Sequence, residues 1–201
     1  FWIDPGTRFG VVKGETRTAW IVDPPSGKIP YTDAGRKRAH AGEARRGYSD
    51  PESRPPPDRC LATGGRTGPP MINGLYNNHY QIVQTPGYVL IHTEMISHAR
   101  IVPLVDKHNA AVLHPLFGDS IGHWEGDKLV IETTNFSPYH AWQDHPAYLT
   151  ESAKVTERFS RVSDKELLYE FTVEDPAFYA HPWKGEITYW NDGERIYEYA
   201  C

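Results

Sequence analysis

The chain has no long hydrophobic run, very little cysteine and no excess of positive charge. No apolar stretch approaches the roughly 18 residues needed to span a bilayer as a helix. Its 21 Lys and Arg against 26 Asp and Glu give a net charge of -5, whereas a nucleic-acid binder normally carries a basic face. The one basic cluster, at residues 36–46, contains Glu43 and no interleaved aromatic residue, so we interpret it as a solvated helical face. The composition argues against membrane-spanning and nucleic-acid-binding functions.

Only two cysteines are present, Cys60 and Cys201, and neither belongs to a C-x-x-C or zinc-type spacing. They are either two unpaired buried thiols or one disulfide, and we favour the disulfide. By the loop-closure estimate such a bond stabilises the fold by roughly 4 to 5 kcal/mol. It would also place the protein in an oxidising compartment.

Helical periodicity is scarce, and alternation of apolar and polar residues takes its place between Tyr80 and Cys201. Short turns around 126–128, 163–165 and 191–193 predict three hairpins. The predicted strands are 80–85, 88–95, 100–104, 120–125, 129–136, 155–162, 166–174, 183–190 and 195–201. We therefore predict an all-β fold, an antiparallel up-and-down meander forming a lipocalin-like barrel or half-barrel, since closure removes exposed edges.

The first part of the chain, residues 1–72, does not fit this pattern. We expect an extended N-terminal arm with a short strand at 18–22, followed by one short surface helix at 33–46 that Asp33 caps. The Pro- and Gly-rich segment 47–72 is either a mobile linker or a wrapped strap pinned by Cys60, and we favour the strap. Residues 73–201 form the predicted barrel domain, and the two parts make one structural unit.

One long motif stands out at 118–136, where the chain reads GDSxGxWEGDxLVxETTNF. Further motifs lie at 23–30, 80–85, 99–104, 157–159, 169–176 and 197–201. With these motifs the chain resembles a large family of secreted bacterial proteins of unknown function. The resemblance implies an exported, periplasmic or extracellular protein whose signal peptide is absent from this chain, and it supplies no activity. The chain departs from the family pattern at His123, where Arg is expected, and in the His-rich stretch 108–114.

Ten histidines in an acidic chain suggest a metal site. The best candidate ligands are His92, Glu94 and His98, because His92 and Glu94 share a strand face and His98 follows a bend. Imidazole with carboxylate suits a divalent transition metal. The spacing matches no recognised metal motif, so surface or hydrogen-bonded histidines are the alternative.

A metal-free acid–base site is also conceivable from the sequence. Glu94, Arg100 and Glu132 are the candidate catalytic residues, with Glu157, Glu170 and Arg158 on neighbouring strands. If they face inward, burial would raise the pKa of one carboxyl while Arg holds another ionised. If they face outward, they are cross-strand ion pairs.

Aromatic residues make up 12% of the chain and suit a ligand-lined cavity. The candidate ligand-binding residues are Tyr88, Trp124, Trp142, Tyr169 and Glu170. Trp142 lies in the segment 139–148, which is rich in aromatic and histidine side chains. This segment is either a lid over the mouth of the barrel or a packed loop.

Three function classes follow from these patterns. We rank first an exported β-barrel protein that binds a small, partly aromatic ligand in a polar-lined cavity. An enzyme, metal-dependent or acid–base, of the lyase, isomerase or hydrolase type comes second. A structural role, with the N-terminal arm joining a neighbouring subunit into a homo-oligomer, comes third.

Overall fold

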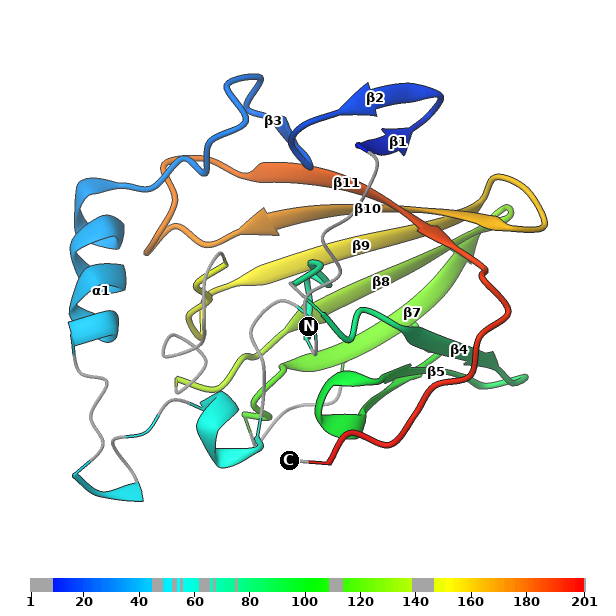
Figure 1. Cartoon of the computed structure of the whole chain (residues 1–201). Coiled ribbons are helices and arrows are strands. Elements are labelled where there is room, and N and C mark those ends of the chain that lie inside the picture. The colour runs from blue at the N-terminus through cyan, green and yellow to red at the C-terminus, as the bar shows by residue number, and fades with distance from the viewer. Residues whose placement is uncertain are drawn as a thin grey trace.

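The computed structural model describes residues 9–44, 49–51, 54, 56–61, 66, 68–74, 76–108, 114–138 and 147–200. Strands dominate, and they form three antiparallel sheets beside one α-helix (Figure 1). The large sheet has six strands in the order β3-β11-β10-β9-β8-β7, the small sheet has the order β4-β5-β6, and β1 pairs with β2. The elements are β1 Gly10–Val12, β2 Glu15–Arg17, β3 Ile21–Asp23, α1 Asp33–Ala44, η2 Pro56–Arg59, β4 Tyr80–Gln84, β5 Tyr88–Thr93, η3 Met95–Ser97, β6 His98–Pro103, β7 Asp119–Glu125, β8 Lys128–Thr134, β9 Lys154–Arg161, β10 Glu166–Glu174 and β11 Trp183–Trp190.

The predicted all-β, antiparallel class is confirmed, and α1 is the single α-helix with given bounds in the described part of the chain. Alternation located most strands to within two residues of their ends, and β10 and β11 lie where the pattern placed them. Consecutive strands from β7 to β11 pair with their neighbours in the chain, and the predicted turns at 126–128 and 163–165 join β7 to β8 and β9 to β10.

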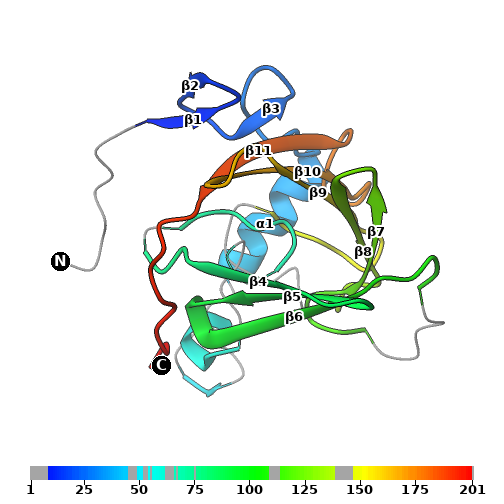
Figure 2. The ribbon, with the colours of Figure 1, turned by 90° about the vertical axis from the view of Figure 1, so that its right-hand side faces the viewer.

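The large and small sheets face each other but do not close into a barrel among the described residues (Figure 2). On one side a parallel bridge between Leu104 and Gly122 joins the end of β6 to β7. On the other side β4 and β11 do not pair. Met71 contacts the sheet interior instead, because its backbone N–H donates to the Tyr169 hydroxyl at 2.8 Å and its carbonyl accepts from the Tyr189 hydroxyl at 3.1 Å. The sheet is therefore rolled but open. The strap over 47–72 stays a prediction, because much of that segment lies outside the described residues.

The predicted last strand, 195–201, is wrong over its described part. Residues 191–200 form no ladder, and β3 pairs with the second edge of β11 only at Lys184 and Gly185. The segment descends from β11 past one end of the small sheet (Figure 2), where the backbone N–H of Tyr199 lies 3.4 Å from the Ser97 hydroxyl.

The predicted extended arm is instead a hairpin over residues 10–17. Its turn residues Lys13 and Gly14 have φ of 53° and 79°, the positive values that a tight two-residue hairpin turn needs. Lys13 Nζ lies 3.0 Å from Glu170 and 2.6 Å from Glu186, which holds the hairpin on the outer face of β10 and β11. Residues 9–32 thus lie on the chain's own sheet rather than reaching outward, and residues 1–8 lie outside the described residues.

The helix α1 begins as predicted, but its cap is Thr32 rather than Asp33. The Thr32 hydroxyl accepts from the backbone N–H of Gly35 at 2.8 Å. Arg36 and Arg38 lie over the Tyr31 and Phe178 rings at 5.8 and 5.5 Å, so part of the basic cluster stacks on aromatic rings while staying exposed.

The core lies between the two facing sheets and continues under α1. Its largest fully buried side chains come mainly from the inward positions of β8 to β11 and from the loop before β11. They include Tyr169, Phe171, Phe178 and Trp183, whose rings pack at tilted or edge-on angles with neighbours such as Tyr179.

We expect Gly35→Ala to destabilise the protein, although Ala normally favours a helix over Gly by about 1 kcal/mol. A Cβ at Gly35 would lie 2.2 Å from the Phe178 carbonyl oxygen, which is backbone and cannot rotate away. The expected loss is about 1–3 kcal/mol in the free energy of unfolding, measured by urea denaturation. The control is Gly87→Ala, because a Cβ there meets nothing within 4 Å. Equal stability of the two variants would contradict the close helix–loop contact.

Candidate functional site

The most concentrated polar chemistry lies in the interior, where Arg100 of β6 meets Glu157 of β9. The guanidinium donates through Nη1 to Glu157 Oε2 at 2.6 Å and through Nη2 to Oε1 at 3.0 Å. Both side chains are buried, at 6% and 0% exposure. Burial disfavours the charge of Arg100, yet the facing carboxylate outweighs it and the pKa of Arg100 is raised. This pair therefore joins the two sheets as a two-pronged, charge-assisted hydrogen bond.

Tyrosine hydroxyls complete this interior network. Tyr169 donates to Glu157 Oε1 at 2.7 Å and accepts from the Met71 backbone N–H. Burial raises the pKa of Tyr169, Tyr189 and Tyr80, so all three phenols stay protonated at neutral pH. The Tyr80 and Tyr189 rings meet edge-on at 5.2 Å. Every strong contact here is between buried groups, so the network is a structural clamp rather than a site open to substrate.

The predicted acid–base trio is not assembled. Arg100 lies inside, whereas Glu94 follows the end of β5 and pairs with His79 Nδ1 at 2.5 Å. Glu132 points outward from β8, where it pairs with Lys154, and the Lys154 hydrogen bond lowers the pKa of Glu132. The prediction fails because alternation assigns two faces to a strand without saying which one turns inward.

The predicted metal ligands are also separated. His98 pairs across the sheet with Thr93, the neighbour of His92, so the two histidines lie on opposite faces of the small sheet. Glu94 lies beyond the strand in the turn that begins η3. Within the part of the chain that is described, no three His, Cys, Asp or Glu residues are placed to hold a metal ion.

Three further histidines, His108, His114 and His123, have carboxylate neighbours. His108 Nδ1 lies 2.8 Å from Asp119 and its Nε2 lies 3.5 Å from Glu132, on the outer face of β7 and β8. His123 lies 3.4 Å from Glu125, and His114 lies 4.0 Å from Glu151. These are hydrogen-bonded or surface histidines, the alternative that the sequence left open.

The predicted ligand-binding residues point in different directions. Tyr169 is buried between the sheets, and its neighbour Glu170 faces outward towards Lys13. Tyr88 is 54% exposed on the outer face of the small sheet, and Trp124 is 44% exposed near the end of β7. Trp142 lies outside the described residues.

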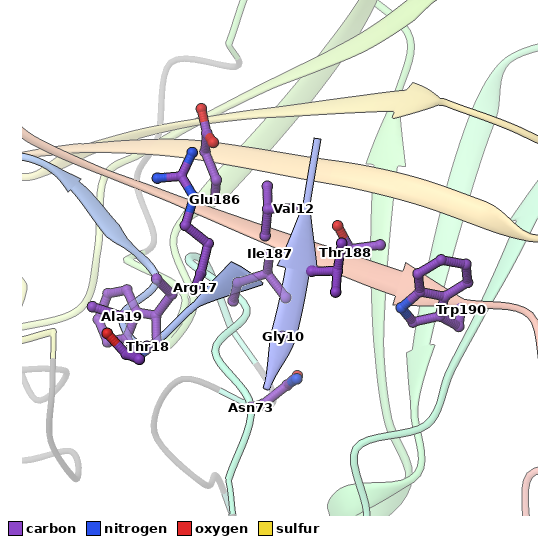
Figure 3. Close-up of a pocket in the computed structure, with 12 residues that line it drawn as sticks. Gly10, Val12, Arg17, Thr18, Ala19, Asn73, Glu186, Ile187, Thr188 and Trp190 are labelled. Atoms are coloured by element: carbon purple, nitrogen blue, oxygen red, sulfur yellow. The ribbon is translucent and has the colours of Figure 1, made fainter. Parts of the chain in front are cut away.

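A groove of about 250 Å³ lies elsewhere, between the β1–β2 hairpin and β11 (Figure 3). Its walls are the β1–β2 hairpin, residues 18–20 that follow it, Asn73, and the C-terminal half of β11. Trp20, Trp190, Val12 and Ile187 supply apolar surface, and Arg17, Thr18, Glu186 and Thr188 supply polar groups. The sequence alone does not indicate this groove, because strands of three residues are too short to show a pattern of alternation. The Lys13-Gly14 pair was the one available turn signal.

The groove walls hold two polar atoms with unmet hydrogen-bonding capacity. Arg17 Nε and Thr188 Oγ1 are both buried and have no hydrogen-bond partner among the described residues. The far end of Arg17 pairs with the exposed Glu15 at 3.0 Å. Glu186 is already neutralised by Lys13, whose pKa is raised mainly by the Glu186 hydrogen bond. The groove thus presents aromatic surface and unpaired donors, but no evident nucleophile or base.

The predicted Cys60–Cys201 disulfide stays a prediction, because Cys201 lies outside the described residues. The described part of the chain contains no free cysteine. Within that same part, none of the helices combines the length and apolar character needed to cross a bilayer.

We expect Glu157→Gln to lower the free energy of unfolding by about 3 kcal/mol, because it leaves the buried Arg100 charge without its counter-ion. Chemical denaturation measures the loss. Glu194→Gln makes the same change on an exposed residue and should be neutral. If the two variants had equal stability, the pair would not be the clamp described here.

The pH dependence of stability should carry a signature of His98. Burial, helped by the nearby Arg100 charge, lowers the pKa of His98 to about 4, below its unfolded value of about 6.5. Between these two values the unfolded chain binds more protons, so His98 costs stability as the pH falls through this window. The cost reaches on the order of 3 kcal/mol near pH 4 and vanishes above pH 7.

His98→Asn should remove that part of the slope, which urea denaturation at pH 4.5 and pH 7.5 would measure. A constant offset between variant and parent at both pH values would contradict a neutral, buried His98.

The chain matches no protein-family model, and it has no significant match among curated proteins or solved structures. The resemblance to secreted bacterial proteins therefore stays a prediction, and the function must be argued from the molecule itself.

Proposed function

We propose that this chain is an exported binding protein that takes a small, partly aromatic ligand, and that the ligand lies in the groove under the β1–β2 hairpin. The observation that carries the proposal is the mixed lining of this groove. Aromatic and aliphatic walls surround a few polar groups, which is the usual composition of a small-molecule site.

The interior between the two sheets is a less suitable ligand site than the groove. The side chains that face it are closely packed, and its buried charges are already paired, since Glu157 accepts hydrogen bonds from Arg100 and Tyr169. Two neutral polar atoms there, Tyr80 Oη and Trp183 Nε1, are buried without a partner among the described residues. A ligand there would have to displace buried aromatic rings, which costs packing energy. The groove needs no such displacement.

Aromatic character of the ligand is supported by the two tryptophans. Trp190 is 59% exposed at one end of the groove, and Trp20 lies in the wall behind the hairpin. A flat ring stacked on Trp190 would cover apolar surface that now faces water, and aromatic contacts add about 0.5–1.5 kcal/mol beyond the area they bury.

The polar end of the ligand is supported by the unpaired atoms beneath the hairpin. An unpaired buried donor costs about 1–3 kcal/mol, so Arg17 Nε and Thr188 Oγ1 favour any arrangement that brings them an acceptor. The hairpin strands have three residues each and are held on β10 and β11 by Lys13, so a small shift can open access to these atoms. A carbonyl or carboxylate oxygen on the ligand would meet this need.

Calorimetric titration with indole-3-acetate, indole-3-acetamide and 3-methylindole tests the proposal. At about 0.3 kcal/mol per non-hydrogen atom, we expect the acid and the amide to bind with Kd on the order of 1 mM or tighter. 3-Methylindole, which lacks the carbonyl or carboxylate acceptor, should bind at least tenfold more weakly.

Three variants locate the binding. Trp190→Ala should weaken the acid and the amide together, whereas Trp124→Ala removes an exposed tryptophan from β7 and should change nothing. Thr188→Val should reduce the difference between the amide and 3-methylindole. Equal effects of Trp190→Ala and Trp124→Ala, or no binding of any of the three compounds, would overturn the proposal.

A further inference from the structure

The outer face of the small sheet is uncharged. Alternation and the paired registers place eight residues on this face: Gln81, Val83, Tyr88, Leu90, His92, Ala99, Ile101 and Pro103. Strands β4, β5 and β6 contain a single charged residue, Arg100, and its side chain points inward and is buried. This contrasts with a chain in which 23% of residues are charged.

Apolar side chains on this face form a row across the strands. Val83, Leu90 and Ile101 lie opposite one another in the register, and Tyr88 lies beside the row. Val83 is 40% exposed, Ile101 61% and Tyr88 54%. A contiguous exposed apolar patch of this kind is typical of an interaction surface.

The edge of this sheet is open as well. β4 is the last strand of the sheet, and in the described residues no further strand pairs with its outer side. Its sequence, YQIVQ, contains none of the charges, prolines or glycines that usually protect an edge from pairing. Ile82, on the inward side of β4, is still 40% exposed.

The C-terminal segment leaves this edge accessible. It passes the start of β4, where Asp192 lies 3.5 Å from His79, and then reaches Ser97 at the start of β6. Gln81, Ile82, Val83 and Gln84 all remain exposed beyond these contacts. The segment therefore crosses the strand ends rather than covering the edge.

We propose that β4 pairs with β4 of a second copy of this chain, in antiparallel register about a two-fold axis at Ile82. In this register Ile82 lies opposite its own equivalent, Tyr80 opposite Gln84, and Gln81 opposite Val83. The pairing is self-complementary, as a two-fold interface requires, and it satisfies the open backbone groups of both edges.

Charge decides between a second copy and a different partner. Two copies with net charge -5 repel each other over most of their surface, but the β4 edge and the adjoining face contribute nothing to that repulsion. The same surface offers a charged partner no complementary group. A neutral surface that is apolar on both sides of its edge strand is best matched by its own copy, and the joined sheet would extend the apolar row across the axis.

The molar mass of the purified protein in solution tests this proposal, measured by light scattering from micromolar to sub-millimolar concentration. The parent chain should reach twice the chain mass at the upper end. Val83→Lys and Ile82→Lys should each weaken the dimer at least tenfold, because they place like charges beside the axis. Val162→Lys adds the same charge at a residue of similar exposure beyond the end of β9 and should dimerise like the parent.

Circular dichroism confirms that each variant is folded. If either of these two changes unfolds the chain, Gln81→Lys tests the same edge at an exposed polar position. Hydrogen exchange adds an independent measurement, since the outward-facing amides of Ile82 and Gln84 should gain protection as the concentration rises. A parent chain that is monomeric throughout the range would overturn the proposal, as would dimers that persist equally in Val83→Lys and Val162→Lys.

Discussion

The ion pair between Arg100 and Glu157 is the interaction on which the arrangement of the two sheets depends. Removing two charges from water costs several kcal/mol each, and only good geometry with additional hydrogen bonds offsets that cost. The two-pronged contact supplies the geometry, and the Tyr169 hydroxyl supplies the additional hydrogen bond to Glu157. Since Tyr169 also holds the backbone of Met71, one carboxylate connects the small sheet, the large sheet and the segment around Met71.

This connection explains why the protein does not resemble a hollow barrel in its interior. A lipocalin-like cavity would need the inward positions of the facing sheets to stay clear, whereas here they carry Arg100, a carboxylate and several aromatic rings in mutual contact. The polar groups that made an internal site attractive are used in holding the sheets together. Binding is therefore better sought outside the rolled sheet, where the β1–β2 hairpin leaves a groove.

The sequence predicted the local structure well and the spatial grouping poorly. Period-two alternation located β10 and β11 because these strands are long and their buried residues alternate regularly with partly exposed ones. The same alternation could not decide that Glu157 faces inward while Glu132 faces outward, since that depends on pairing between distant strands. His92 and His98 are close in sequence, yet the turn at η3 places them on opposite faces. The strand predicted at 195–201 is absent over its described part, where the chain leaves β11 and contacts Ser97 beside the small sheet instead.

The motifs that carry the family resemblance are largely accounted for by packing. Gly118 has a φ of 73° and a Cβ there would lie 2.6 Å from the Thr134 carbonyl oxygen, so this position of the long motif serves a turn. Asp175 is buried and accepts hydrogen bonds from the backbone N–H groups of Thr150 and Ala177, which fixes the loop after β10. Tyr169 and Glu157 form the interior clamp. Arg17, Thr188 and Trp190, which line the groove, all lie outside those motifs. In this chain the motifs therefore serve the architecture, and the residues that would recognise a ligand lie outside them.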